Sequence, residues 1–124
     1  MRILVVDDDA LAGEMTRAIL EELGYEVASA EDGVEAMRAL DADRSISLIV
    51  CDLNMPLVSG LDLFRELRGQ GLETPFILLS GDDPSLLGEE ALALDACLLK
   101  DSSLGEALPA AIAASLSGKG ILER

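Results

Sequence analysis

Short apolar runs alternate with helix-like stretches five times along nearly the whole chain, and this alternation limits the possible fold more than any other feature. Most of the runs are rich in Leu and β-branched residues, which suits strands buried on both faces. They occupy residues 3–6, 26–29, 48–51, 76–79 and 97–99. Strands that alternate with helices favour a parallel sheet covered by helices on both faces. The sequence therefore predicts an α/β fold, a doubly wound five-stranded parallel sheet in one domain over residues 1–124.

The stretches between the runs carry apolar residues at helical spacing. In the first, which Asp9 can cap and Gly24 can end, every fourth residue is apolar: Leu11, Met15, Ile19 and Leu23. The second expected helix follows an Asp32-Gly33 turn, and its apolar positions are Val34, Met37 and Leu40. The third follows Gly60, with Leu61, Phe64 and Leu67 as its apolar positions. The fourth starts at Asp83-Pro84-Ser85, and its apolar positions are Leu86, Leu87, Ala91 and Leu94. The last helix is expected over residues 103–117, where Pro109 should kink it or mark its first turn. Residues 118–124 are expected to be a frayed tail or the start of a linker.

Charged or hydroxyl side chains stand directly after four of the five expected strands. The first run is followed by Asp7 and Asp8, the third by Asp52, the fourth by Ser80 and the fifth by Lys100. In a doubly wound sheet the binding site lies at the carboxyl ends of the strands, and the first and third strands are neighbours at the point where the winding reverses. We therefore expect these side chains to meet at one edge of the sheet.

Such a cluster points to phosphoryl chemistry supported by a metal ion. Three carboxylates in one crevice repel one another unless a cation neutralises them. Oxygen ligands in a chain without histidine suit Mg²⁺, which also accepts a phosphate oxygen. One carboxylate can then act as a nucleophile and form an acyl phosphate, while Mg²⁺ and the Lys100 ammonium neutralise the phosphoryl oxygens. Ser80 is placed to donate a hydrogen bond to one of those oxygens.

Each of these residues also has a purely structural interpretation. Asp9, or Asp8, can simply cap a helix, a lone Asp or Lys at a strand end is usually only solvated, and Ser80-Gly81 can be a turn. These interpretations do not predict that four strand ends carry suitable groups together. The coincidence favours a functional site.

Composition excludes several other classes of function. The formal net charge of −15 and the scarcity of aromatic residues argue against binding nucleic acid, because phosphates would be repelled and bases would find few rings to stack on. No window approaches the roughly 20 apolar residues of a membrane span, and the N-terminus lacks a secretory cleavage pattern. Cys51 and Cys97 each lie in an expected strand, which favours two buried reduced thiols over a functional disulfide. A cytoplasmic location fits these features.

Four segments of the chain resemble the sequence landmarks of bacterial response-regulator receiver domains, such as chemotaxis regulators. They are ILVVDDD (3–9), LIVCDLNMPLVSGLDL (48–63), ILLSGDD (77–83) and ACLLKDSS (96–103). The Asp-x-x-Met-Pro-x-x-x-Gly pattern over residues 52–60 is specific, and the segments follow one another in the family's order. The resemblance implies a flavodoxin-like (βα)₅ fold with strand order 2-1-3-4-5.

The resemblance also implies roles for individual residues. Asp52 would accept a phosphoryl group from the phosphohistidine of a sensor histidine kinase or phosphotransfer protein, with Mg²⁺, or Mn²⁺ in its place. The implied metal ligands are Asp7, Asp8, Asp52 and the backbone carbonyl of Asn54. Lys100 matches the lysine that contacts the phosphoryl group, and Ser80 matches the hydroxyl residue that turns toward it. The implied protein is a switch that acts on a downstream protein and is no enzyme beyond its own phosphoryl transfer and slow dephosphorylation.

Some positions depart from the family's pattern. The family usually has an aromatic residue three positions before the lysine, where this chain has Cys97, so the usual coupling of that residue to Ser80 is in doubt. Asp101 follows Lys100 where many members have Pro, and residues 80–100 are slightly few, which predicts a trimmed or irregular fourth helix. Homodimerisation through the face around the fourth helix, fifth strand and fifth helix is therefore expected to be weak at most.

Two further residues flank the expected phosphorylation site. Asn54 and Asp82 are placed to orient or block the water that attacks the phosphoryl group, and we expect them to modulate its lifetime.

Three alternative functions fit the sequence less well. A pseudo-receiver, which keeps the fold as an interaction module without phosphorylation, is supported only by Cys97. An aspartate-nucleophile phosphatase would need a second acid where Asn54 stands, and Asn54 cannot transfer a proton. A flavodoxin-like electron carrier conflicts with the acidic first loop, where a flavin phosphate would have to bind. Both a stand-alone regulator and a receiver from a longer protein fit the sequence.

Overall fold

The structure, a computed structural model, contains a five-stranded sheet and four helices within the residues that it describes, 2–81, 88 and 93–120. The strands are β1 (Arg2–Val6), β2 (Glu26–Ala30), β3 (Ile46–Asp52), β4 (Phe76–Ser80) and β5 (Ala96–Leu99). The helices are α1 (Ala10–Glu22), α2 (Gly33–Ala42), α3 (Gly60–Gly69) and α4 (Leu104–Gly120). All strands pair in parallel in the order β2-β1-β3-β4-β5. The expected doubly wound sheet and its strand order are confirmed.

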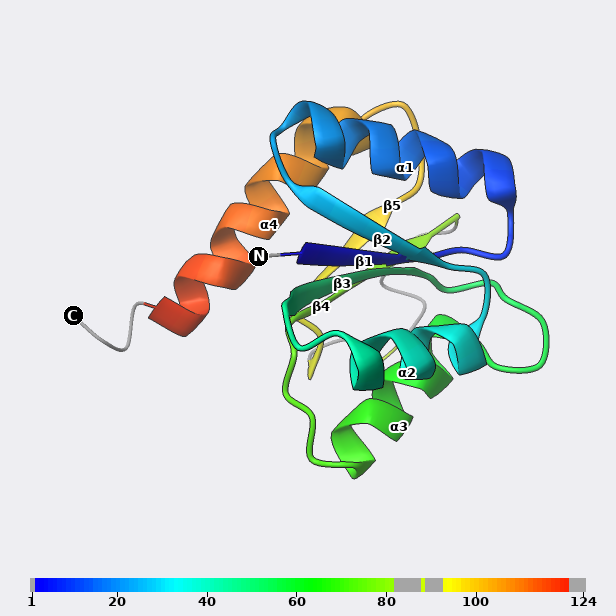
Figure 1. The fold of residues 1–124 in the computed structure, drawn as a ribbon. Helices are drawn as coiled ribbons and strands as arrows, with labels where there is room; N and C mark the ends of the chain where they lie inside the picture. The colour runs from blue at the N-terminus through cyan, green and yellow to red at the C-terminus, as the bar shows by residue number, and fades with distance from the viewer. Residues whose placement is uncertain (1, 82–87, 89–92, 121–124) are drawn as a thin grey trace.

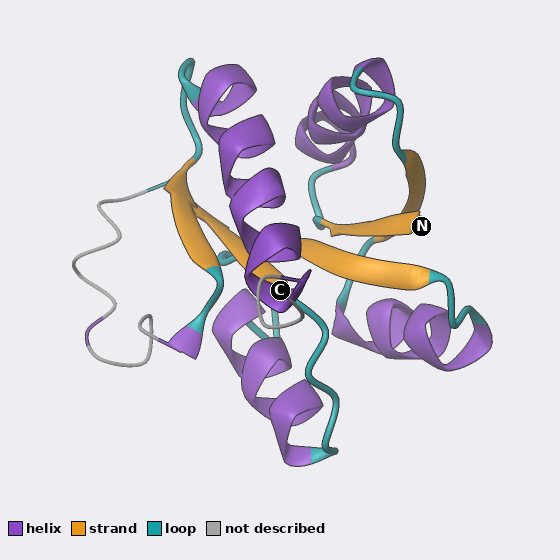
Figure 2. Ribbon diagram, turned by 90° about the vertical axis from the view of Figure 1, so that its left-hand side faces the viewer, coloured by secondary structure: helices purple, strands orange, loops and turns teal. Residues whose placement is uncertain are grey.

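The helices lie in two layers, with α1 and α4 on one face of the sheet and α2 and α3 on the other (Figures 1 and 2). Successive strand residues point to opposite faces, so each strand supplies both cores. On β1, for example, Leu4 and Val6 join the core under α2 and α3, whereas Ile3 and Val5 join the core under α1 and α4. This two-sided burial explains why the central strands read as continuous apolar runs.

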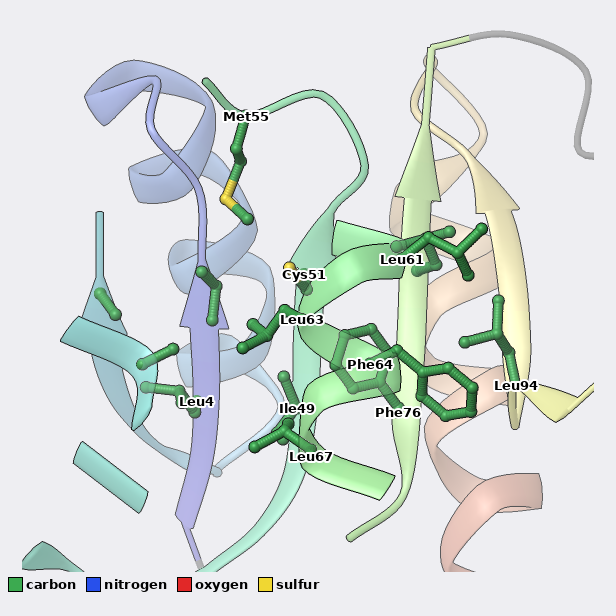
Figure 3. Close-up of a cluster of buried hydrophobic side chains, with 14 of the residues drawn as sticks. Leu4, Ile49, Cys51, Met55, Leu61, Leu63, Phe64, Leu67, Phe76 and Leu94 are labelled. Atoms are coloured by element: carbon green, nitrogen blue, oxygen red, sulfur yellow. The ribbon is translucent and has the colours of Figure 1, made fainter. Parts of the chain in front are cut away.

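The core beneath α2 and α3 holds both phenylalanines (Figure 3). Phe64 of α3 meets Phe76 of β4 edge to face, with ring centroids 5.3 Å apart. Leu61, Phe64 and Leu67, the apolar positions expected on this helix, are all buried. This packing fixes α3 against β3 and β4, directly after the loop that leaves Asp52.

Helix α1 begins and ends where the sequence indicated. The Asp9 side chain accepts hydrogen bonds from the backbone N–H groups of Leu11 and Ala12. At the other end Gly24 adopts a φ of +93°, and the N–H groups of Gly24 and Tyr25 donate to the carbonyls of Glu21 and Leu20, respectively. This pairing is a Schellman motif, which favours glycine at the left-handed position.

The expected apolar stripe of α1 was wrong except at Ile19, which is partly buried against the core under α1 and α4. Leu11 and Met15 are 69% and 63% exposed, and Leu23 is also exposed, whereas the buried residues are Thr16 and Leu20. A row spaced by four residues drifts around a helix of 3.6 residues per turn, so it leaves the core side within a few turns. The Thr16 hydroxyl is tolerated because it donates to the Ala12 carbonyl.

Other local expectations need correction. The Asp32-Gly33 pair is no free turn, because the Asp32 side chain accepts from the Glu35 N–H and caps α2, whose first residue is Gly33. Pro109 does not mark the first turn of α4, which begins five residues earlier. Because proline has no N–H, the helix lacks the hydrogen bond that residue 109 would otherwise donate to the Gly105 carbonyl. Helix α4 also continues past residue 117, to Gly120.

Part of the expected fourth helix lies outside the described residues. This applies to its start at 83–85 and to Leu86, Leu87 and Ala91, whereas Leu94 is buried but lies in a bend before β5 and not in a helix. None of the helices in the described part of the chain combines the length and the apolar character needed to span a bilayer.

The two cysteines are free thiols on strands that do not touch. Cys51 of β3 is in register with Leu78 of β4, and Leu78 is in register with Cys97 of β5. One strand therefore separates them, since neighbouring strands lie about 4.8 Å apart. Cys51 is buried as expected, but Cys97 is only half-buried, at the margin of the core under α2 and α3.

Candidate functional site

Five polar side chains that the sequence placed after strands lie at the carboxyl-end edge of the sheet. Asp7 and Asp8 follow β1, Asp52 and Ser80 are the last residues of β3 and β4, and Lys100 follows β5. Because β1 lies between β2 and β3, the loop after β1 meets the end of β3 directly. The expected convergence of Asp7, Asp8, Asp52 and Lys100 is therefore present.

The three carboxylates form a compact cluster. Each offers one oxygen, and these oxygens lie within 4.8 Å of one another. Asp7 and Asp52 are buried, whereas Asp8 is exposed. Hard oxygen donors arranged with two at the wall and one at the rim fit Mg²⁺, which binds through one or two carboxylates and keeps several waters. The donor set thus suits the metal that the sequence indicated.

Lys100 joins two of these carboxylates. Its Nζ donates to Asp7 Oδ2 at 2.8 Å and to Asp52 Oδ1 at 3.1 Å. Burial opposes the charge on the ammonium, but the hydrogen bonds and charges of both aspartates outweigh it and raise the pKa of Lys100. Lys100 is therefore held as a cation between the carboxylates.

Asp52 experiences the opposite balance. Burial raises the pKa of its carboxyl group, and the negative charges of Asp7 and Asp8 add to this, although the hydrogen bond and charge of Lys100 act against it. The net effect is a raised pKa of Asp52. A carboxylate whose ionised form is disfavoured in this way gains from any further cation placed beside it.

Backbone contacts fix the first loop of the site. Asp7 Oδ1 accepts the Asp9 N–H at 2.9 Å, while its Oδ2 binds Lys100. Asp9 in turn caps α1, so the structural interpretation of Asp9 was correct and it coexists with the site. The start of the helix and the position of Asp7 are thereby set together.

The loop after Asp52 is closed by a glycine that packs on the Asp52 backbone. The Gly60 N–H donates to the Leu53 carbonyl at 2.9 Å. A Cβ at Gly60 would clash with the Asp52 carbonyl oxygen and would lie 2.6 Å from a methyl group of Leu78. Only glycine allows this approach, because a backbone atom cannot move away as a flexible side chain could. The Ser59–Asp62 capping box, which the sequence analysis missed, starts α3 at the same place.

The other residues expected at the site are Ser80, Asn54, Cys97 and Asp82. Ser80 is buried at the end of β4, and its carbonyl accepts the Lys100 N–H at 2.7 Å. Asn54 is exposed in the loop after β3, and the role of its carbonyl stays a prediction. Cys97 packs at the edge of a core, and Asp82 lies outside the described residues.

A groove that the sequence analysis did not identify opens beside Lys100. It has a volume of about 590 Å³ and runs between α1 and the segment that leads from β5 into α4. Its lining residues are Asp9, Ala12, Met15, Thr16, Ile19, Lys100, Asp101, Ser102, Leu104 and Gly105. The misread apolar row of α1 was the available signal, since the exposed Met15 borders this groove, and Ile19, which packs against the core under α1 and α4, also lines it.

Comparison with known families gives a match over most of the chain. The family model described as the response regulator receiver domain matches residues 3–112. The response regulator MprA of Mycobacterium tuberculosis is 42% identical over 96 residues, which cover 77% of this chain and 40% of that protein. The MprA of Mycobacterium avium is also 42% identical, over 77% of this chain and 41% of that protein. The chain thus spans about two fifths of the length of the curated relatives it matches.

Solved structures of similar proteins share the fold. The response regulator TrrA of Thermotoga maritima, crystallised in complex with Mg²⁺ and BeF, superposes with a TM-score of 0.80 at 30% identity, covering 91% of this chain and 97% of that one. A receiver domain from Clostridium thermocellum gives a TM-score of 0.85 at 27% identity, covering 98% of each chain.

Proposed function

This chain belongs to the response regulator receiver domain family of two-component signalling, and from that premise we propose that Asp52 is its phosphoacceptor. The observation that carries the proposal is the Lys100 ammonium held between the buried carboxylates of Asp7 and Asp52. Three carboxylates with oxygens within 4.8 Å of one another repel each other and destabilise the fold, so their presence points to a ligand that relieves this repulsion.

The proposed reaction transfers a phosphoryl group from a phosphohistidine. An Asp52 carboxylate oxygen attacks phosphorus, the new O–P bond forms as the N–P bond breaks, and the imidazole leaves with the bonding electron pair. The product is an acyl phosphate on Asp52. Lys100 neutralises the negative charge on the transferred oxygens, and Ser80 at the end of β4 is the expected hydrogen-bond donor to one of them.

A divalent cation completes the proposed site. Asp7, Asp8 and Asp52 would hold Mg²⁺, with the backbone carbonyl of Asn54 as a further ligand, and Mn²⁺ is expected to substitute. When bound, the ion supplies positive charge that draws the phosphoryl oxygens into place. Asp7 keeps its orientation through the Asp9 N–H, and Lys100 needs only to turn from Asp7 toward the incoming group.

The groove beside Lys100 is the proposed docking site of the phosphodonor protein. It leads to Lys100, and Met15 on its border is largely exposed. Apolar side chains that a partner covers beside a charged group exclude water from it. The proposed partners are therefore a histidine kinase or phosphotransfer protein on this side and a downstream protein that senses the phosphorylated state.

The alternative functions remain weaker. A pseudo-receiver would not need Lys100 between Asp7 and Asp52, which are the groups that phosphorylation requires. A phosphatase would need an acid at the position of Asn54, so we propose a switch that acts only on its own phosphoryl group.

Intact-mass analysis tests the proposal. The protein is incubated with a small phosphodonor such as acetyl phosphate, with Mg²⁺ or with a chelator. We expect a mass increase of one phosphoryl group that needs Mg²⁺ and disappears in Asp52→Asn. An exposed aspartate of α2 provides the matched control, because Asp41→Asn makes the same change away from the site and should leave the adduct intact.

The absence of an adduct on the folded protein would overturn the proposal in favour of a pseudo-receiver. An adduct that persists in Asp52→Asn would move the acceptor to another carboxylate.

A further inference from the structure

A second groove, distinct from the one beside Lys100, lies between α2 and α3 on the opposite face of the sheet. Its volume is about 340 Å³, and we call it the α2–α3 groove. It is lined by Gly33, Val34, Met37, Val58, Asp62, Leu63 and Glu66. Val34 is 59% exposed and Val58 is 37% exposed, although both are aliphatic. The groove thus presents apolar surface to solvent close to the loop that leaves Asp52.

Leu57 directly precedes Val58, which lines this groove, and it adopts a backbone conformation that leucine does not favour. Its φ is +69°, and the Val58 N–H donates to the Pro56 carbonyl at 2.7 Å across it, which makes Leu57 the centre of a strained γ-turn. A side chain in the left-handed region costs about 1 kcal/mol relative to glycine. The side chain is also fully exposed. The fold therefore gains neither packing nor backbone stability from a leucine here.

The exposed aliphatic residues Val58 and Val34 both line the groove, and Leu57 precedes Val58 in the chain. Val58 follows Leu57 directly, and its side chain lies 3.5 Å from the position that a Cβ on Gly33 would take. Val34 is the next residue of α2. Exposed apolar groups that gather at one place, instead of being scattered singly, mark a site of interaction.

The charged residues that line the groove are both acidic. Asp62 and Glu66 stand one helical turn apart on α3, and each accepts a hydrogen bond from a neighbour on the same helix or at its end, Asp62 from Arg65 at 2.7 Å and Glu66 from Gln70 at 3.2 Å. Further carboxylates at the start of α2 are those of Glu31, Asp32 and Glu35, and the basic residues near the groove are Arg38 and Arg65. Acidic groups therefore outnumber basic ones around the groove, and the whole chain carries −15. A partner with basic flanks would be attracted to this surface.

We propose that Leu57 and the α2–α3 groove form a docking surface for an amphipathic helix of a partner protein, with aliphatic side chains on its buried face and Lys or Arg on its flanks. Groove residues recur at helical spacing on both walls, as Val34 and Met37 on α2 and as Asp62 and Glu66 on α3. A third helix laid along two others presents side chains at the matching i, i+3, i+4 and i+7 positions. The surface exists without phosphorylation, so the proposal does not depend on Asp52.

A titration of the full chain with a designed peptide tests the proposal. The probe is a helical peptide with Leu at positions i, i+3, i+4 and i+7 and Lys elsewhere, added to methyl-labelled protein and followed by NMR. We expect shifts at the methyl groups of Val34, Leu57, Val58 and Leu63. Leu57→Asn should weaken binding about tenfold, as loss of a central apolar contact does.

Two matched controls keep the test specific. Leu23→Asn removes another exposed leucine, at the end of α1, and should not change the affinity. A peptide of the same composition in scrambled order, without an apolar face, should bind more weakly and leave the Leu57 methyls unshifted. Leu57→Asn is expected to fold, since asparagine tolerates the left-handed conformation.

Three results would overturn the proposal. The first is equal binding of the scrambled peptide, which would reduce the attraction to net charge. The second is a set of shifts confined to the groove beside Lys100. The third is unchanged affinity in Leu57→Asn, or no binding at all.

Discussion

Each edge of the sheet holds one basic side chain between two carboxylates, but the two arrangements differ in burial. At the amino-end edge, Arg2 binds Glu26 at 3.1 Å and Asp43 at 2.6 Å. At the carboxyl-end edge, Lys100 binds Asp7 at 2.8 Å and Asp52 at 3.1 Å. The side chains of Arg2 and Glu26 are 39% and 71% exposed, whereas those of Asp7 and Asp52 are 3% and 7% exposed.

The difference in burial distinguishes the amino-end edge, where Arg2 links segments of the chain, from the carboxyl-end edge, where the proposed phosphorylation site lies. Arg2 links β1 to the start of β2 and to the segment before β3, and surrounding water and salt screen its charges. The Lys100 arrangement loses solvation on both carboxylates, and Asp8 adds a third negative charge nearby. The same ionic pattern therefore contributes little to stability at the amino-end edge. At the carboxyl-end edge it leaves carboxylate repulsion that a bound cation would relieve.

Removal of the cation from the buried edge should give the largest effect. Lys100→Met leaves Asp7 and Asp52 facing each other without a cation between them, which should lower the free energy of unfolding by about 3 kcal/mol when Mg²⁺ is chelated. Saturating Mg²⁺ should recover much of this loss, because the ion replaces the missing positive charge. Urea unfolding of the variant and the unmodified protein, in chelator and in Mg²⁺, measures both values.

Arg2→Met provides the matched control at the other edge. It removes a cation from two carboxylates in the same way, and it should have a small effect that salt reduces and Mg²⁺ does not alter. Equal losses in the two variants would contradict the comparison of the two edges.

A smaller loss of stability is expected from a methyl group added at Gly60, beside the buried carboxylates. Gly60→Ala places a Cβ against the Asp52 carbonyl and Leu78, so α3 or the loop must shift, at a cost of about 2 kcal/mol. The shift should also slow formation of the Asp52 adduct. Gly69→Ala, at the end of the same helix with nothing within 4 Å of the new Cβ, should be neutral or stabilising in the same thermal and urea unfolding experiments.

The pH dependence of Asp52→Asn should show the smallest change. Burial raises the pKa of Asp52 above the ordinary 3.8, so its ionised form opposes folding. The stabilising contribution of its protonated form is present below pH 3.8 and is lost as pH rises through the folded-state pKa. In chelator, Asp52→Asn should therefore be more stable than the unmodified protein at pH 7, and this advantage should shrink toward pH 4. A constant difference across that range in urea unfolding would show that Asp52 is not the titrating group.

The sequence could predict the site better than the surfaces around it. Asp7, Asp52 and Lys100 were located because chain order and parallel pairing force strand ends to one edge, whatever packs around them. The buried side of α1 could not be read in this way. Thr16 is buried and Leu11 exposed because the position of the helix on the sheet decides burial, and residue type alone does not report it.

Leu57 shows a second limit of sequence reasoning. In the sequence it is one more aliphatic residue in an apolar segment, between Pro56 and Val58. Only the backbone, with its positive φ and the turn across it, reveals that this leucine is strained and exposed.

The hydrogen bond from the Lys100 N–H to the Ser80 carbonyl has a mechanical consequence. It extends the pairing of β4 and β5 one residue beyond β5, at 2.7 Å. This hydrogen bond joins the main chains of Ser80 and Lys100, the two residues proposed to contact the phosphoryl oxygens. A displacement of Ser80 toward a new acceptor would have to move the Lys100 backbone or break this hydrogen bond, so a change at the proposed phosphorylation site would reach the end of β5.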